Sequence, residues 1–286
     1  MTDNRTILIT GATGNQGGAV AQALQGAGFH LRGLTRKPDS ERAAALARHG
    51  VEIVKGDLDD EATLRRALAG AWGVFAVQNA QEAGVDREEA QGKRLATLAR
   101  EAGVEHYVYT SVGSADKRTG IPHFDSKWRI EETVRGLRFP SHVILRPVFF
   151  MDNLLAPFSV QGSTLNWALG QRTKLQMIAV DDIGWFGARA FTDAAALNRR
   201  EIDLAGDVRT MPEAAEILTE ALGRPIAFAQ TPIEQVRQYS KDMALMLEWF
   251  ERVGYSADIP GLESEFGRTL TKLPNWARRQ GQPNGH

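Results

Sequence analysis

Three glycines near the N-terminus, Gly11, Gly14 and Gly17, have a spacing that indicates binding of a phosphate group. Glycine has no Cβ atom, so the backbone of such a loop can come close to a pyrophosphate. Taken alone the triplet is weak evidence, because its spacing is G-x-x-G-x-x-G rather than G-x-G-x-x-G and an ordinary turn is the alternative. The segments on either side decide between the two interpretations.

Those segments are typical of a buried strand and an amphipathic helix. Residues 6–10 form a β-branched apolar run before the loop, and apolar residues recur at helical spacing in 19–27 after it. Strand, loop and helix in this order are the context of a dinucleotide site, because the helix N-terminus attracts an anion. The predicted loop contacts are Gly11, Thr13, Gly14, Asn15, Gln16 and Gly17.

Two cations follow the second predicted strand, residues 30–35, at the point where the adenosine ribose of a dinucleotide is recognised. A carboxylate there favours NAD, whereas an arginine accommodates the 2′-phosphate of NADP. Arg36 can meet a phosphate with a fork of donors, and Lys37 adds a second cation. An ordinary solvated basic turn is the alternative, but the position favours NADP(H) as the cofactor.

Polar residues at the ends of the third and fourth predicted strands, 51–58 and 73–77, complete the expected cofactor site. Asp57 and Leu58 can flank an adenine ring, although Asp57 could equally cap the next helix, unless Asp59 caps it and frees Asp57. Gln78 and Asn79 follow the fourth strand, and ligands of doubly wound sheets bind at the carboxyl ends of the strands. Asp57, Leu58, Gln78 and Asn79 are therefore predicted cofactor contacts, whereas Asp59 is not.

The glycine loop resembles that of the short-chain dehydrogenase/reductase superfamily, in its extended or atypical branch. This resemblance implies a serine at the end of the fifth strand, and a tyrosine four residues before a lysine on the next helix. Ser111 and Lys127 match this pattern, but His123 stands where the tyrosine is expected. Lys127 can still hold the hydroxyls of the nicotinamide ribose, because an ammonium has three donors. An exposed helix lysine is the alternative.

The role of His123 has two interpretations. An imidazole titrates near neutrality, so His123 could supply a proton in place of the missing phenol. The preceding Pro122 is equally consistent with a loop that enters a helix, with His123 merely near its start. His123 and Lys127 are therefore the candidate catalytic residues.

Four features together are similar to the NmrA-like family, and the resemblance covers most of the chain. They are the loop G-A-T-G-N-Q-G, the Thr35-Arg36 turn, the His123 and Lys127 pair, and residues 146–153. The resemblance implies an NADP(H)-binding Rossmann protein. Members of this family include redox sensors and transcriptional co-regulators with little dehydrogenase activity, beside reductases of quinones or plant phenolics.

The resemblance also implies cofactor contacts from a segment after the sixth strand, at Phe150, Asp152 and Asn153. In the family this segment usually begins Tyr-Phe-Glu-Asn. The present chain has Phe150-Met151-Asp152-Asn153, so the phenol of the family pattern is missing here too.

Five alternations of strand and helix predict the α/β class, with a Rossmann-type doubly wound parallel sheet and a smaller C-terminal α/β lobe. We expect an NADP-binding domain at 1–153, with a returning strand near 200–206. The remaining residues, 154–286, are expected to form most of the lobe that faces a substrate or partner.

Within that lobe the pattern predicts a helix that starts at Thr210 with proline in its first turn, and one long helix over 233–253. Asp181 or Asp182 is expected to cap an earlier helix. The polar tail 278–286 is predicted to fray.

Composition excludes several classes of function. The 286 residues include no cysteine, which rules out disulfides and thiolate chemistry, and no metal site is predicted. The net charge is -1 with both signs interspersed, so we expect no direct contact with nucleic acid. No apolar run approaches the ~18 residues of a membrane span, and no signal segment precedes the first strand. We therefore expect a cytoplasmic protein without membrane contact.

Two functions of different class follow from these observations. The first is an NADP(H)-binding redox sensor whose output passes to a protein partner. The second is an NADPH-dependent reductase of a small quinone or conjugated carbonyl. The missing tyrosine favours the sensor, because the proton donor of the superfamily is absent.

Overall fold

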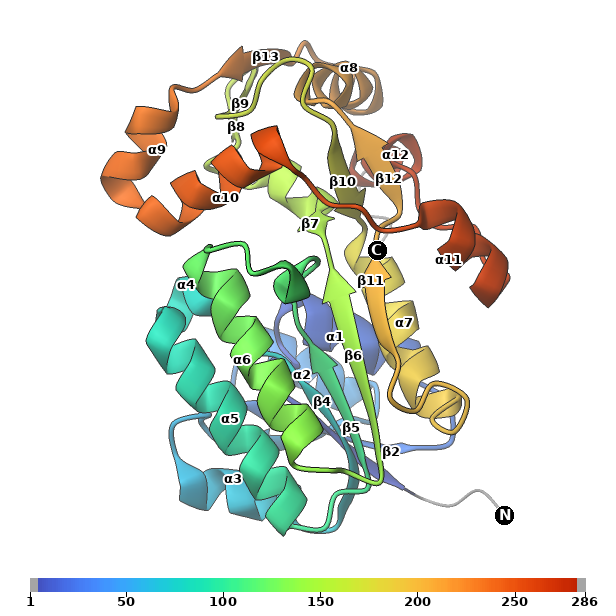
Figure 1. The fold of residues 1–286 in the computed structure, drawn as a ribbon. Helices are drawn as coiled ribbons and strands as arrows, with labels where there is room; N and C mark the ends of the chain where they lie inside the picture. The colour runs from blue at the N-terminus through green and yellow to red at the C-terminus, as the bar shows by residue number, and fades with distance from the viewer. Residues whose placement is uncertain (1–4, 282–286) are drawn as a thin grey trace. The chain divides into compact units, whose positions relative to one another are not determined.

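The computed structural model describes residues 5–281 (Figure 1). The chain divides into two compact units. The first comprises Met1–Asp116, His123–Arg146 and Ile183–Ile202. The second comprises Lys117–Pro122, Pro147–Asp182 and Asp203–His286.

A seven-stranded sheet forms the centre of the first unit. Its order is β11-β6-β5-β4-β1-β2-β3, and the pairs from β3 through to β6 are parallel. The strand order reverses at β1 and β4, which places a topological switch point between them. The strands are β1 (Thr6–Ile9), β2 (His30–Thr35), β3 (Glu52–Lys55), β4 (Ala71–Ala76), β5 (His106–Thr110), β6 (Ser141–Pro147) and β11 (Glu201–Leu204).

Helices cover both faces of this sheet (Figure 1). Apolar side chains of α3, α5 and α6 pack with those of the strands in one core cluster. On the other face α7 approaches α1 closely, since a Cβ atom at Gly184 would lie 2.8 Å from Ala19 Cβ. The helices are α1 (Asn15–Ala23), α2 (Glu41–Arg48), α3 (Glu61–Leu68), α4 (Ala80–Ala83), α5 (Val85–Glu101), α6 (Pro122–Gly136) and α7 (Val180–Thr192). The predicted α/β doubly wound fold is confirmed.

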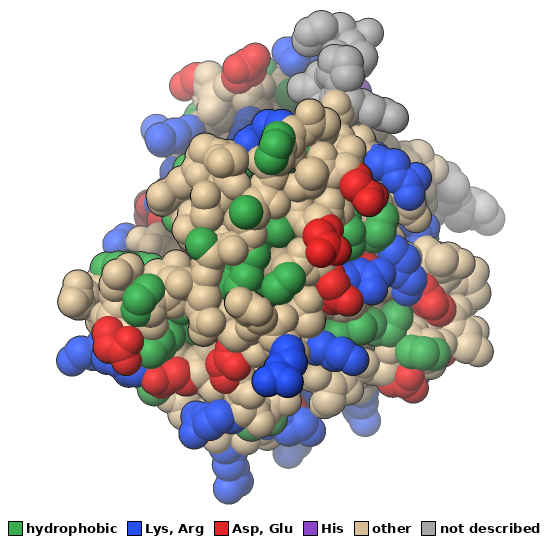
Figure 2. All heavy atoms as spheres, turned by 90° about the horizontal axis from the view of Figure 1, so that it is seen from above, with side chains coloured by type: hydrophobic (Ala, Val, Ile, Leu, Met, Phe, Trp, Pro, Cys, Tyr) green, Lys and Arg blue, Asp and Glu red, His purple; other side chains and the backbone are tan. Residues whose placement is uncertain are grey.

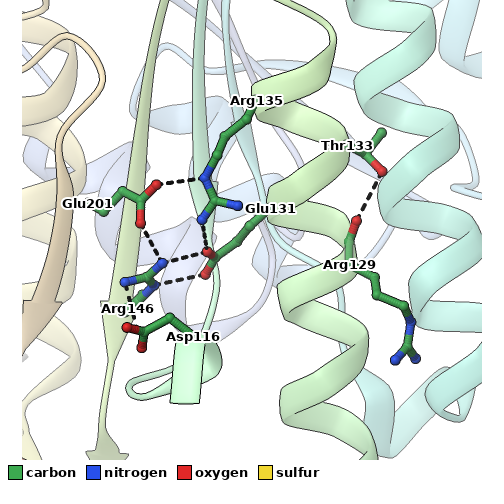
Figure 3. A network of polar contacts seen from close by, with 7 residues as sticks. All are labelled: Asp116, Arg129, Glu131, Thr133, Arg135, Arg146 and Glu201. Atoms are coloured by element: carbon green, nitrogen blue, oxygen red, sulfur yellow. Dashed lines mark hydrogen bonds and ion pairs between the residues drawn. The ribbon is translucent and has the colours of Figure 1, made fainter. Parts of the chain in front are cut away.

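A buried ionic network attaches α6 to the sheet (Figure 3). Glu131 of α6 is fully buried and accepts hydrogen bonds from Arg146 Nε of β6 at 2.9 Å and from Arg135 at 2.6 Å. Arg135 also donates to Glu201 of β11 at 2.7 Å. Because removal of one partner leaves a buried charge uncompensated, such a network fixes the position of its helix.

The first residue of β5 is a buried, neutral histidine, His106. His106 lies between the Ser141 hydroxyl and the Ala190 carbonyl, 2.8 Å from each, and its ring stacks on Trp72. Burial lowers the pKa of His106 from 6.5 to about 4. The folded chain therefore resists protonation at this site.

Acid is expected to destabilise the protein through His106. A pKa that is lower in the folded state means that the unfolded chain binds the proton more tightly. The stabilisation is complete above pH 6.5 and is lost as the pH falls towards 4, by on the order of 3 kcal/mol. Urea unfolding between pH 7 and 4 would measure it. The slope of the unfolding free energy against pH should flatten in His106→Asn. It should persist in His49→Asn, the control, because His49 is exposed. Equal slopes in both variants would show that His106 is not the cause of the acid sensitivity.

The second unit contains two small sheets and the C-terminal helices. One sheet joins β7 (Phe149–Phe150), β10 (Leu175–Ile178) and β12 (Asp207–Arg209), and the other joins β8 (Val160–Gln161), β9 (Thr164–Trp167) and β13 (Ala227–Gln230). The helical segments are the 3₁₀ turn η2 (Met151–Leu155) and the α-helices α8 (Met211–Leu222), α9 (Ile233–Tyr239), α10 (Lys241–Arg252), α11 (Ile259–Phe266) and α12 (Leu273–Gly281).

Three predictions for this unit have clear outcomes. The helix start at Thr210 is confirmed, with a capping box between Thr210 and Glu213. The single helix over 233–253 is wrong, because Ser240 is extended and its hydroxyl caps a new helix by accepting from Met243 N–H. The fraying expected from residue 278 is wrong as far as 281, where α12 ends, and 282–286 lie outside the described residues.

The helix cap predicted at Asp181 or Asp182 is also wrong, because both residues lie inside the first turn of α7. The Asp182 side chain is fully buried there. The carboxylate accepts hydrogen bonds from Thr271 N–H at 2.8 Å and from Arg268 at 3.2 Å. Asp182 therefore attaches the segment between α11 and α12 to the first turn of α7. Sequence periodicity could not indicate this long-range contact.

Figure 2 shows acidic and basic side chains interspersed on one face, without a continuous basic stripe on it. Within residues 5–281, no helix has the length and apolar character needed to cross a membrane.

Candidate functional site

The glycine loop folds tightly at the end of β1. Gly11 has φ +58°, a left-handed conformation that favours glycine, and its carbonyl accepts from Gly14 N–H at 2.8 Å. A Cβ atom at Gly17 would lie only 2.4 Å from the Gly11 carbonyl oxygen. The loop and the first turn of α1 therefore approach each other here more closely than any side chain at position 17 allows.

The helix after the loop begins without a side-chain cap from its N-cap residue. α1 begins at Asn15 after Gly14, and Gly14 offers no capping side chain. Within residues 5–281 the first-turn N–H groups of this nine-residue helix thus receive no hydrogen bond from an N-cap side chain, which is the arrangement that binds phosphate in Rossmann proteins. Asn15 is exposed and Thr13 is half-buried at this end.

Hydrogen bonds join the loop to the neighbouring strands at the switch point. The Thr10 hydroxyl donates to the Val77 carbonyl at 3.1 Å and accepts from Val77 N–H at 2.8 Å. Gln16 Oε1 accepts from the Thr110 hydroxyl at 2.7 Å. The carboxyl ends of β1, β4 and β5 are therefore held in a fixed relation around the loop.

Arg36, the predicted phosphate ligand, forms an ion pair with Glu82 of α4. Both side chains are about half exposed, and the hydrogen bond to Glu82 raises the pKa of the guanidinium above its usual value. Lys37 is exposed next to it. Two cations thus lie at the end of β2, one of them already paired with a carboxylate.

The expected adenine contacts lie after β3. Asp57 does not cap the next helix, because Asp60 does so by accepting from Ala62 N–H and Thr63 N–H. Asp57 Oδ1 instead accepts from Asp59 N–H at 3.0 Å. Leu58 is half-buried. The cap at Asp60 leaves one oxygen of Asp57 for a ligand, and neither Asp57 nor Asp59 is needed to start α3.

Buried polar side chains, Gln78 and Ser111, follow the ends of β4 and β5. Gln78 and Ser111 are each 4% exposed, and within residues 5–281 neither the Gln78 amide atoms nor the Ser111 hydroxyl has a hydrogen-bond partner. Such groups are rare in folded proteins, since each costs free energy. Asn79 differs, because it is exposed and its Oδ1 caps α4 by accepting from Gln81 N–H at 3.0 Å.

Lys127 and His123 lie on the first turns of α6. The Lys127 ammonium is 2.8 Å from Oε1 of the fully buried Glu88 and 6.0 Å from the centroid of the Tyr109 ring. His123 is half-buried, and its ring meets that of Phe124 edge-on, with centroids 4.8 Å apart. Four residues apart on one helix, the two side chains face the same side of α6.

The remaining predicted contacts belong to the second unit. Phe150 ends β7 and pairs with Ile178 of β10, and Asp152 and Asn153 lie in η2. The pKa of the Asp152 carboxyl is raised above its usual value because burial outweighs the opposing effect of backbone N–H donors, including that of Val180. One Asp152 oxygen is buried without a hydrogen-bond partner in the described part of the chain.

A cavity of about 860 Å³ lies in the second unit, where β9 and β13 end in front of α9 and α10. Its volume falls within the ~300–1,000 Å³ of small-molecule sites. The lining is Ala168, Gln230, Thr231, Pro232, Ile233, Glu234, Leu245, Glu248, Glu251 and Arg252. Residues 5–281 contain no cluster of three or more acidic or histidine side chains that could hold a metal ion.

Two residues of the site were not predicted from the sequence. Glu82 belongs to a four-residue helix in a segment that has no periodicity. Glu88 had a usable signal, because it lies seven residues before the buried Leu95 and so shares the apolar face of α5. A carboxylate on such a face indicates a buried partner.

A doubly wound sheet with a glycine-rich loop at its switch point defines a Rossmann-type protein. The model of the NmrA-like family matches residues 3–280. The NAD(P)H azoreductase of Xenophilus azovorans is 30% identical over 245 residues, which cover 84% of this chain and 82% of that protein. The chain therefore belongs to the NmrA-like family.

Solved structures share its fold, among them two complexes with a nicotinamide nucleotide. The negative transcriptional regulator NmrA in complex with NADP has a TM-score of 0.77 at 19% identity, covering 96% of this chain and 94% of that one. The NADPH-dependent quinone oxidoreductase of Escherichia coli in complex with NADPH also has a TM-score of 0.77, at 24% identity, covering 96% and 100%.

Proposed function

We propose that the protein binds NADP(H) through the first unit and acts as a redox sensor with little dehydrogenase activity. In this proposal the pyrophosphate lies against loop 11–17 and the N-terminus of α1. The 2′-phosphate meets Arg36 and Lys37, and the adenine lies between Asp57 and Leu58.

The close approach at Gly17 is the observation that carries cofactor binding. A loop without room for a single methyl group, followed by a helix without a side-chain cap, presents backbone donors to an anion. The buried unpartnered atoms of Gln78 and Ser111, at the ends of the adjacent strands, fit the polar nicotinamide half. Relatives of the same fold were crystallised with NADP and NADPH, which supports the same choice.

The sensor interpretation depends on position 123. Reduction of an ordinary carbonyl requires a proton donor beside the cofactor, and the phenol that the superfamily uses is replaced by His123. The ammonium of Lys127, the other group of that pair, is paired with Glu88. The site then binds the dinucleotide without a dedicated acid, and the output passes to a protein partner.

A reductase of a quinone or another conjugated acceptor is the second candidate. It is favoured by the 30% identity to an NAD(P)H azoreductase over most of both chains. Such acceptors take up a hydride to give stabilised anions, which solvent or His123 could protonate. Lys127 and the bound cofactor would then suffice.

Turnover separates the two candidates. NADPH oxidation by a panel of quinones and an azo dye is expected to remain near the rate in buffer. If His123 is a general acid, His123→Phe should lower turnover by ~10²–10⁴ and leave NADPH affinity unchanged. Robust oxidation by the wild type that collapses in His123→Phe would overturn the sensor in favour of the reductase.

Arg36→Ala is expected to weaken NADPH binding about tenfold and leave NADH binding unchanged. A hydrogen bond to a charged group contributes ~1.5–3 kcal/mol, or about ten- to a hundredfold in affinity. The lower end applies because the guanidinium is half exposed and must release Glu82. Calorimetric titration with both nucleotides measures the effect.

Arg48→Ala is the matched control for this variant, because Arg48 is an exposed arginine in the last turn of α2. It removes the same charge without touching the end of β2. Equal losses for NADPH and NADH in Arg36→Ala would refute the assignment of the 2′-phosphate to Arg36.

A further inference from the structure

Glu88 is a carboxylate with no exposure to solvent, on the inner face of α5. An ionised carboxylate in such a place is costly unless cations and hydrogen-bond donors surround it. Retention of the charge therefore requires specific partners, and the first turns of α6 provide them.

Each oxygen of Glu88 faces one of two consecutive residues of α6. Oε1 lies 2.8 Å from the Lys127 ammonium, and Oε2 accepts a hydrogen bond from the Ser126 hydroxyl at 3.0 Å. The Lys127 side chain is only 12% exposed. A long, flexible side chain is thereby confined to one position.

The two helices that form this contact are fixed against each other. One turn further along α5, a Cβ atom at Gly92 would lie 2.5 Å from Ile130 Cδ1, so the Ile130 side chain of α6 packs directly against the backbone of α5. One residue later on α6, Glu131 binds Arg146 of the sheet. The Glu88 carboxylate is therefore held at a fixed point relative to the strand ends.

We propose that Glu88 is the positioning residue for Lys127 and orients its ammonium for the nicotinamide ribose of the cofactor. This inference rests on the proposed function. An ammonium has three donors, so Lys127 can keep its ion pair with Glu88 while its donors bind ribose hydroxyls. The carboxylate also removes the rotamer freedom that a lysine would otherwise lose on binding.

A purely structural ion pair between α5 and α6 is the competing explanation, and fragment binding distinguishes the two. Adenosine 2′,5′-bisphosphate contains the half of NADPH that Arg36 and the loop are proposed to hold, but it lacks the nicotinamide ribose. Loss of positioning should weaken NADPH alone. A distorted fold should weaken both ligands.

Glu88→Gln retains the shape of the side chain and an oxygen for Ser126, and removes the charge that holds Lys127. Calorimetry should show NADPH binding about tenfold weaker and bisphosphate binding unchanged within twofold. Lys127→Met should give the same pattern. The double variant should be no weaker than Lys127→Met, since Glu88 acts only through Lys127.

Glu89→Gln is the matched control. Glu89 also joins α5 to α6, through an ion pair with Arg129 at 2.7 Å, but it does not touch Lys127. Both affinities should stay at wild-type values in this variant. If Glu88→Gln does not fold, Glu88→Asp keeps the charge on a shorter stem, and it should still weaken NADPH selectively.

Three results would overturn the assignment. They are an equal loss of both ligands in folded Glu88→Gln, unchanged NADPH binding in Glu88→Gln or Glu88→Asp, and additive losses in the double variant. Each of these refutes the positioning role of Glu88 without refuting the proposal that the wild type binds NADP(H). A wild type that binds neither ligand refutes the proposed function, and this assignment with it.

Discussion

Gly17→Ala is expected to weaken NADPH binding by more than about a hundredfold. The new methyl group would lie 2.4 Å from the Gly11 carbonyl oxygen and 2.6 Å from that of Thr10. Both contacts are to backbone, so the loop must move away from the helix N-terminus and the proposed pyrophosphate site opens. Calorimetric titration, with circular dichroism to verify folding, measures the change.

Gly136→Ala is the control for this variant. Gly136 lies in the last turn of α6, and a methyl group added there would meet no atom within 4 Å, so alanine should be neutral or slightly stabilising. NADPH affinity within threefold of wild type in folded Gly17→Ala would show that the dinucleotide binds elsewhere.

Glu131→Ala is expected to lower the free energy of unfolding by about 3–5 kcal/mol, the usual cost of breaking a buried ion pair. Arg146, 4% exposed, would lose both hydrogen bonds to Glu131 and keep only its contacts with Glu201 and Asp116 among those seen in Figure 3. The melting temperature should fall on the order of 10 °C. Thermal unfolding measures the shift.

The neighbouring Glu132→Ala provides the comparison, because Glu132 is exposed on the same turn of α6. Its effect should lie within about 0.5 kcal/mol of zero. If Glu131→Ala were as harmless as Glu132→Ala, the network would not fix α6, and the rigid placement of Lys127 would need another cause.

The sequence predicted the fold well because the relevant signals are local. The apolar run before Gly11 and the helical pattern after it define β1 and α1, and each later strand has its own run of apolar residues. Parallel strands joined by helices leave few alternative topologies. The Thr210 cap was likewise evident within four residues.

The parts that could not be predicted depend on contacts between distant segments. The three glycines look alike in the sequence, but a Cβ atom at Gly14 would lie 3.2 Å from the Gly11 carbonyl oxygen, against 2.4 Å for one at Gly17. The pairing of Lys127 with Glu88 joins residues 39 positions apart, and only the packing of α5 on α6 brings them together.

The ion pair between Arg36 and Glu82 has a consequence for the speed of exchange. In the proposed complex the 2′-phosphate takes the place of the Glu82 carboxylate on the Arg36 guanidinium. The Glu82 carboxylate pairs with Arg36 again when the nucleotide leaves. The departing ligand then never leaves a bare cation behind, which lowers the barrier to release. The proposed role as a redox sensor requires ready exchange of NADPH and NADP, and this ion pair would favour rapid exchange of the bound nucleotide over its long retention.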